Sequence, residues 1–333
     1  MKKTLTIFVL ALGSLTAVAQ QDPQFSQYMH NKVFMNPAYA GMRRALCLSL
    51  IARNQWTGFE GAPQTGVFSG DIYFPGPGKF GSGVGLNVMY DKLGFEKNFR
   101  FDLDYSFHIE MGTPGTLAIG LQLGAFNKQI GGPWVATQNW MTDQAIPPTL
   151  TSTKFDFGMG LWYQRQNIWF GLSSTHLAPA KFSGTSSPIS TGGPPQTYPL
   201  NYQMARHYFI TGGINIWQGN IWEIRPSFLV KTDATITTFD LNVTALYNQR
   251  FWFGASYRMQ DAIIPMIGFQ LPLATTTPDE RPGGGLKVGF AYDFTTSSLK
   301  NYSSGTFELY VNYCRPLTRK TSKTGHGDTR IFD

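Results

Sequence analysis

The amino-acid sequence predicts an all-β protein, a transmembrane antiparallel β-barrel of about 14 strands in a bacterial outer membrane. Three observations support this fold class. The chain begins like an exported protein. Charged residues make up only 14% of it and aromatic residues 15%, whereas ordinary soluble domains are about 25% charged. Beyond the first residues, apolar side chains recur at every second position, because lipid-facing and lumen-facing residues alternate along a membrane-spanning strand.

The first 19 residues have the pattern of a secretory signal peptide. Lys2 and Lys3 form a positive start, residues 5–19 are uncharged and mostly apolar, and Ala17 and Ala19 provide a small-residue cleavage site. The apolar stretch is shorter than the ~20 residues that a spanning helix needs. We therefore exclude residues 1–19 from the fold.

Alternation is clearest between residues 99 and 110. Phe99, Phe101, Leu103, Tyr105, Phe107 and Ile109 share one face, which we assign to lipid. The length suits a tilted membrane strand of ~9–11 residues. The same period predicts strands near 46–54, 65–74, 82–91, 98–110, 116–127, 154–164, 167–174, 205–217, 222–231, 238–247, 250–259, 262–271, 286–294 and 306–315.

Loop lengths predict how the barrel is oriented. The links after even-numbered strands are short, except for 272–285, and the two longest, 128–153 and 175–204, follow odd-numbered strands. Bacterial barrels have short periplasmic turns and long external loops. We therefore expect both termini in the periplasm and both long loops outside the cell. Residues 46–315 would form the barrel, 20–45 a periplasmic or plug segment, and 316–333 a basic periplasmic tail.

The segment before the barrel is too apolar to remain solvated, so we expect it to dock at the periplasmic mouth or in the lumen and to block a continuous pore. Asn36 and Pro37 predict a turn within it. The residues assigned to this docked segment are Phe25, Tyr28, Met29, Asn36, Pro37 and Tyr39.

The polar face of the clearest strand is a candidate lumen site. It is either a selectivity or binding surface or, as the simpler interpretation, the ion-pair network that a polar lumen requires. Its members are Arg100, Asp102, Asp104, His108 and Glu110.

Cys47 opens the first expected strand and Cys314 ends the last. Because a closed barrel pairs these strands, both cysteines should lie on the lumen side of the periplasmic rim, within one or two strand spacings of ~4.8 Å. A disulfide between them is possible in this oxidising compartment.

Aromatic residues near the strand ends are either carbohydrate platforms or, as we favour, the interfacial girdle of a membrane barrel. They include Trp56, Trp169, Trp217, Trp222 and Trp252.

Several classes of function are not indicated. The net charge of +7, two of it from Lys2 and Lys3, is modest and spread out, so we expect no nucleic-acid partner. His176 follows Ser173 and Ser174 but lacks the Gly-x-Ser-x-Gly elbow of a hydrolase, and a loop histidine is the better interpretation. The five histidines have no pair at metal-ligand spacing. We expect no enzyme activity, cofactor or metal.

Several sequence blocks are more specific than the barrel pattern. They are residues 21–29 (QDPQFSQYM), 36–41 (NPAYAG), 53–56 (RNQW), 62–65 (APQT) and 301–309 (NYSSGTFEL). Together they resemble the PorP/SprF family of outer-membrane proteins of the type IX secretion system in Bacteroidota. The resemblance covers about residues 20–315. It implies an outer-membrane component, not an enzyme, that helps to secrete large proteins or to anchor them, such as gliding adhesins. The polar tail departs from barrels that end on a terminal aromatic residue.

The resemblance and the expected topology lead to two hypotheses. In the first, the barrel binds a secreted surface protein outside and type IX secretion components in the periplasm. The external contact would be loop 175–204, either a recognition surface or merely a mobile loop, with Lys181, Pro188, Pro194 and Pro195 as candidates. The periplasmic contact would include Arg319, Lys320 and Lys323 of the tail, unless the tail is a disordered end with no partner. In the second, the barrel is a channel for small solutes.

Overall fold

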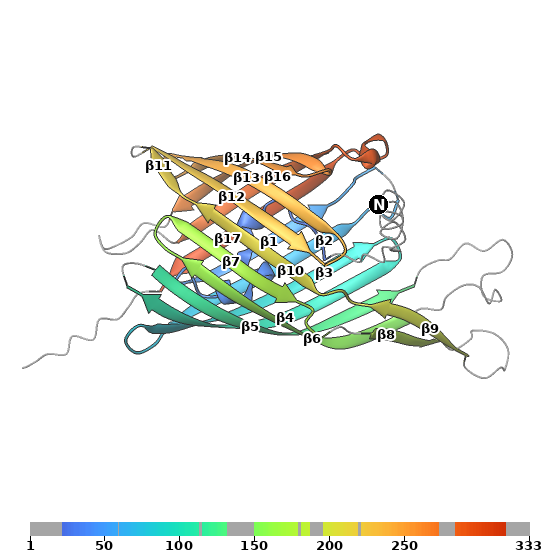
Figure 1. Cartoon of the computed structure of the whole chain (residues 1–333). Coiled ribbons are helices and arrows are strands. Elements are labelled where there is room, and N and C mark those ends of the chain that lie inside the picture. The colour runs from blue at the N-terminus through green and yellow to red at the C-terminus, as the bar shows by residue number, and fades with distance from the viewer. Residues whose placement is uncertain are drawn as a thin grey trace, which may run out of the picture.

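The protein forms a closed antiparallel β-barrel, which a computed structural model describes for residues 22–58, 60–112, 115–131, 150–178, 181–186, 196–218, 221–272 and 284–317. The expected signal peptide and the expected basic tail beyond residue 317 lie outside the described residues. Neighbouring strands pair in chain order, and β1 pairs with β17 to close the wall (Figure 1). Among the described residues, no helix has the length and apolar character to cross a membrane.

Fourteen strands make up the wall, as the sequence predicts. They are β1 (Ala45–Asn54), β2 (Gln64–Pro75), β3 (Phe80–Leu93), β4 (Glu96–Met111), β5 (Gly115–Ile130), β6 (Leu150–Gln164), β7 (Ile168–Thr175), β10 (His207–Ile214) continued by β11 (Ile216–Gln218), β12 (Trp222–Thr232), β13 (Thr237–Tyr247), β14 (Phe251–Arg258), β15 (Ala262–Pro272), β16 (Gly285–Thr295) and β17 (Thr306–Pro316). A short 3-10 helix, η4 (Ser298–Asn301), lies between the last two strands.

Side-chain alternation along the strands confirms the expected lipid face. In β4, Phe99, Leu103 and Tyr105 are exposed on the outside, whereas the alternate residues Arg100, Asp102 and Asp104 are buried on the inside. An apolar exterior is stable only against lipid, because exposed patches of this extent are rare on soluble monomers. The barrel is therefore an outer-membrane protein.

Two local features differ from the sequence prediction. The strand expected at 205–217 is divided into β10 and β11 at Asn215, although the backbone N–H of Asn215 still donates to the carbonyl oxygen of Asn167 in the register of the β7–β10 ladder. The division lies across from the stretch of β12 that contains Pro226, which has no N–H to offer to the ladder. The expected loop 175–204 contains a hairpin of its own, β8 (Lys181–Ser186) and β9 (Gln196–Gln203), which projects beyond the wall (Figure 1). The sequence does not reveal it because β8 has only six residues and Pro199 within β9 argues against a strand.

The two ends of the barrel differ. We call the end where β1 begins and β17 ends the proximal mouth, and the end carrying β8 and β9 the distal mouth. The segment before β1 contains η2 (Tyr28–His30), α2 (Lys32–Met35) and η3 (Pro37–Tyr39). It runs through the lumen from Asp22, near the distal mouth, to Ala45 at the proximal mouth. Asp22 and Pro316 therefore lie at opposite ends of the barrel, and not at one shared mouth as the sequence suggested.

The structure places Cys47 opposite Cys314 where β1 and β17 pair, with 4.1 Å between their Cα atoms. Both side chains are buried and joined in a disulfide. Because 267 residues separate the two cysteines along the chain, the bond links the first and last wall strands and encloses the whole barrel.

Candidate functional site in the lumen

The segment before β1, residues 22–44, fills the lumen, and we call it the plug. Phe25, Tyr28, Phe34 and Met35 are buried in an apolar cluster with side chains from strands around the wall. The wall side chains in this cluster include Ile51, Val67, Met89, Phe126, Phe209, Leu229 and Tyr310. These residues come from β1, β2, β3, β5, β10, β12 and β17, so the contacts surround the plug. The lumen is occupied by the chain itself.

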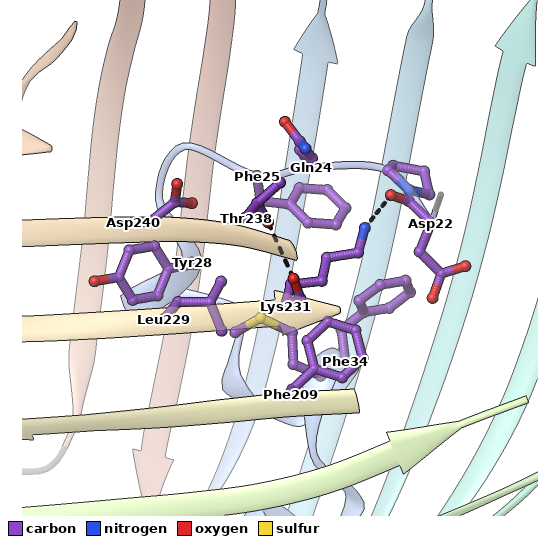
Figure 2. Close-up of a pocket in the computed structure, with 12 residues that line it drawn as sticks. Asp22, Gln24, Phe25, Tyr28, Phe34, Phe209, Leu229, Lys231, Thr238 and Asp240 are labelled. Carbon is purple, nitrogen blue, oxygen red and sulfur yellow. Dashed lines mark hydrogen bonds between the residues drawn. The ribbon is translucent and has the colours of Figure 1, made fainter. Parts of the chain in front are cut away.

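A network of charged residues holds the distal end of the plug. The Asp22 carboxylate lies 2.9 Å from Nε2 of His176 and 3.5 Å from the Arg100 guanidinium. Its backbone carbonyl accepts a hydrogen bond from Lys231, as the dashed line in Figure 2 shows. Charge-assisted hydrogen bonds are about twice as strong as neutral ones. This attraction explains why residue 22 lies at the distal mouth.

His176 is the centre of this distal network, with carboxylates on both ring nitrogens. Its Nδ1 lies 2.5 Å from an Asp156 oxygen, and its Nε2 faces Asp22. Burial alone lowers the pKa of His176, but the charge of Asp22 and the hydrogen bonds of both carboxylates outweigh it and raise the pKa to about 9. His176 is therefore an imidazolium at neutral pH. It follows the end of β7, outside the strand as the sequence suggested, but its side chain is buried in the lumen.

His207 brings a third candidate metal ligand to the same place. One ligand atom each from Asp22, His176 and His207 lies within 4.8 Å of the others, although the two histidines are far apart in sequence. A metal would need neutral imidazoles here. Arg100 opposes a divalent cation, because its Nη1 lies 3.4 Å from Nε2 of His176. The arrangement fits an ion-pair network better than a metal centre.

We predict that alkaline pH weakens plug docking through His176. A histidine whose pKa is raised on folding contributes stability below its unfolded pKa of 6.5, and loses it as the pH rises through about 9. The loss should be at most about 3 kcal/mol. The apparent melting temperature of the detergent-solubilised barrel should fall between pH 6.5 and pH 9.5. In His176→Gln this fall should be absent, and an equal fall in the variant would assign the effect to other groups, such as Lys231.

A second network fixes the plug at Ser26 and Gln27. Both backbone N–H groups donate to the carboxylate of Glu308, at 2.8 and 2.7 Å. Arg53 pairs with the same carboxylate at 3.0 Å and with Asp293 at 2.9 Å. The Arg53 and Glu308 side chains are at most 1% exposed. An ion pair buried this deeply is stable only when further hydrogen bonds satisfy it, and the plug backbone provides them.

The Asn36–Pro37 turn packs directly against the wall. Asn36 accepts a hydrogen bond from the Ala38 N–H and donates to the carbonyl oxygens of Leu161 and Leu172. A Cβ atom on Gly160 would lie 2.0 Å from the Asn36 side-chain oxygen. Glycine is therefore required in the wall for this contact.

Lumen side chains also satisfy polar groups of the plug backbone. Ser173 donates to Met35 O, Ser106 to Ala38 O, and His108 lies 2.9 Å from Ala40 O. A buried irregular segment needs such partners, because unpaired backbone groups are costly in a dry interior. Ser173 is thus turned toward the plug and not toward His176, which argues against the hydrolase reading.

The polar row of β4 faces the plug over most of its length. Arg100, Asp102, Asp104 and His108 are each at most 3% exposed, whereas Glu110 is exposed at the proximal rim and pairs with Arg44. Arg100 pairs with Asp102 at 2.6 Å. The sequence identified this row, but only the docked plug explains why most of its side chains are buried from water.

The tryptophans near the strand ends do not share one environment. Trp222 is exposed on the outside, as a girdle residue should be. Trp252 is instead 2% exposed and packs edge-on against His30 of the plug, and Trp169 stacks on Trp162. The girdle assignment is therefore wrong for Trp169 and Trp252. Their rings face inward because the plug supplies an apolar surface there.

The expected partner-binding residues fall largely beyond the described chain. Pro188, Pro194 and Pro195 lie outside it, as do Arg319, Lys320 and Lys323. Lys181 begins β8, and the neighbouring Phe182 is buried, with its ring 5.9 Å from that of Phe126. The projecting hairpin is therefore connected to the lumen by an apolar contact.

Comparison with known proteins identifies a family and a fold. Residues 17–313 match the model of the type IX secretion system membrane protein PorP/SprF. Among solved structures, the Pseudomonas putida toluene transporter TodX has 10% identity and a TM-score of 0.52, over 86% of this chain and 93% of that one. The monoaromatic hydrocarbon channel CymD has 12% identity and a TM-score of 0.52, over 87% and 93%. No protein of curated function matches the sequence.

Proposed function

Because the chain belongs to the PorP/SprF family of type IX secretion system membrane proteins, we propose that it is a plugged scaffold that binds a partner at each mouth. At the distal mouth, outside the cell, it holds a secreted surface protein such as a gliding adhesin. At the proximal mouth, in the periplasm, it contacts components of the secretion system. The family membership carries this proposal, and the occupied lumen supports it, since a scaffold needs no open pore.

A small-solute channel is the second candidate. It is favoured by likeness to structures described as toluene transporters and hydrocarbon channels. At 10–12% identity this likeness concerns the fold alone. The plug argues against free diffusion through the lumen, because its apolar cluster joins strands around the wall. Conductance of the native barrel in planar bilayers separates the candidates. A plugged scaffold should conduct almost no ions, and steady conductance would favour the channel.

We predict the orientation from loop lengths. Single cysteines replacing Ser183, in β8 at the distal mouth, and Thr113, in the link between β4 and β5, should differ in labelling by a membrane-impermeant maleimide on whole cells. Ser183→Cys should react and Thr113→Cys should react only after the outer membrane is permeabilised. Cys47 and Cys314 are joined in a disulfide and should not react with the maleimide, so the native chain gives no background labelling. Labelling of Thr113→Cys alone would reverse the orientation.

Partner binding at the distal mouth is tested by deleting residues 183–197. We expect the variant to fold, to keep its periplasmic contacts and to lose retention of the surface protein. An equal deletion in the other long loop, residues 133–147, is the control.

Deleting residues 318–333 should instead weaken periplasmic association alone, by removing a positive segment whose attraction is sensitive to salt. If cells lacking the whole gene anchor every secreted protein normally but lose uptake of a small solute, the channel function takes the place of the scaffold.

A further inference from the structure

A water-accessible cavity of about 280 Å³ lies near the proximal mouth, between the plug and the wall. The plug contributes Lys32 and Arg43 to its lining. The wall contributes Arg165 from the turn after β6, Arg225 from β12 and Lys287 from β16. We call it the proximal cavity. Its five positively charged side chains come from separate parts of the chain, and the fold brings them together.

Protein carboxylates neutralise only part of this charge. Arg43 pairs with Asp71 at 2.7 Å, and Arg225 pairs with Glu223 at 2.8 Å. Among the described residues, no carboxylate pairs with Lys32, Arg165 or Lys287 within 4.0 Å. The cavity therefore retains an excess of positive charge in a confined space.

The aromatic contacts of Lys32 hold its amino group at the cavity and provide no negative charge to pair with it. Its Nζ lies 3.7 Å from the ring centroid of Trp169 and 5.3 Å from that of Tyr39. Burial lowers the pKa of Lys32, and the nearby charges of Arg225, Arg43 and Lys287 lower it further. This direction is the expected result of like charges held together in a low-dielectric surrounding. A bound anion would relieve the repulsion.

Access to the proximal cavity is from one side. Toward the distal mouth the apolar part of the plug, including Phe25, Tyr28 and Phe34, is buried against the wall. Toward the proximal mouth the lining includes the exposed turn residues Arg165 and Gln166. The cavity is therefore a pocket that opens to the proximal mouth and is closed toward the distal mouth, and it is not a segment of a conducting path.

We propose that the proximal cavity binds a small, multiply charged oxyanion, with phosphate or carboxylate groups, that enters from the proximal mouth. The Lys32 and Lys287 amino groups, protonated beside a bound anion, and the Arg165 guanidinium match a ligand with at least two negative charges, since one monovalent ion leaves repulsion between the others. The volume is just below the ~300–1,000 Å³ typical of small-molecule pockets, so the ligand is small or is the acidic end of a larger molecule. This inference does not depend on the proposed scaffold function.

Isothermal titration of the full-length barrel in non-ionic detergent tests the proposal with three probes: inorganic pyrophosphate, citrate and a hexaglutamate peptide. We expect at least one probe to bind, more weakly as salt increases. Lys32→Met and Lys287→Met should each reduce its affinity at least tenfold. Lys79→Met, which removes an exposed positive charge at the same mouth but outside the cavity, should bind like the native chain.

The pattern of binding identifies the ligand chemistry. Binding of pyrophosphate alone indicates a phosphate ligand, citrate a free polycarboxylate, and the peptide alone an acidic segment of a partner protein. Thermal unfolding gives a second measurement that does not depend on heat of binding: the bound probe should raise the melting temperature of the native chain but not that of Lys287→Met. If no probe binds, or if the lysine variants bind as well as Lys79→Met, the proposal is wrong.

Discussion

Alanine at both Gly120 and Gly160 is expected to displace the plug from the barrel wall. An added Cβ would lie 2.1 Å from the Ala38 nitrogen and 2.0 Å from the Asn36 side-chain oxygen, respectively. The contact at Gly120 cannot be relieved by moving a side chain, because the Ala38 nitrogen belongs to the plug backbone. The contact at Gly160 is with a side chain, but three hydrogen bonds hold Asn36 in place. Overpacking typically costs ~1–3 kcal/mol per site, and here both substitutions act on the same few plug residues.

Displacement should change permeability and protease sensitivity together. The strands β5 and β6 keep their pairing, so the barrel should remain folded while the plug is released. We expect steady conductance in planar bilayers and cleavage within residues 22–44 by added protease, both nearly absent in the native chain. Gly66→Ala is the matched control, because a Cβ there meets nothing within 4 Å. If the double variant does not conduct and its plug resists the protease, docking of the plug does not depend on these glycines.

Glu308→Gln should produce the second large effect. The Glu308 carboxylate accepts hydrogen bonds from Ser26, Gln27 and Arg53 and is fully buried. The amide has one acceptor oxygen and no charge, so at least one plug N–H and part of the Arg53 charge lose their partner. Breaking a buried ion pair by removing one member typically costs ~3–5 kcal/mol.

The measurement is amide hydrogen exchange, which reports on local opening of the plug. In the native chain the Ser26 and Gln27 amides should be protected, and in Glu308→Gln they should exchange several hundredfold faster or more. Glu110→Gln is the control, because Glu110 pairs with Arg44 at the exposed rim, where ion pairs contribute ~0–1 kcal/mol. Equal exchange in the native chain and Glu308→Gln would mean that Glu308 does not hold the plug.

The sequence predicted the wall well because each wall strand has one lipid face and one lumen face. The apolar row of Phe99, Leu103 and Tyr105 could be read from spacing alone, and all three side chains are exposed on the outside. The same counting placed Cys47 and Cys314 on facing strands, as the structure pairs them. Spacing failed for the β8–β9 hairpin, where β8 is short and Pro199 interrupts β9, and for the break at Asn215.

The candidate site was predictable only in part. The apolar character of Phe25, Tyr28 and Phe34 indicated that the segment before the barrel must be covered, but not which lumen residues would cover it. The Asp22, His176 and His207 cluster joins residues from three regions of the chain, and no sequence spacing reveals it. The inward positions of Trp169 and Trp252 also depend on the plug that they contact.

The sequence by itself determined that this chain is a membrane barrel, because lipid on one side and a polar lumen on the other impose a period of two on every wall strand. Tertiary structure decided what fills the lumen and how it is held. Those contacts join residues far apart in the chain, such as Glu308 with Gln27 and Gly120 with Ala38. They depend on the curvature and register of the closed wall, which set the distances across the lumen and which no local pattern specifies.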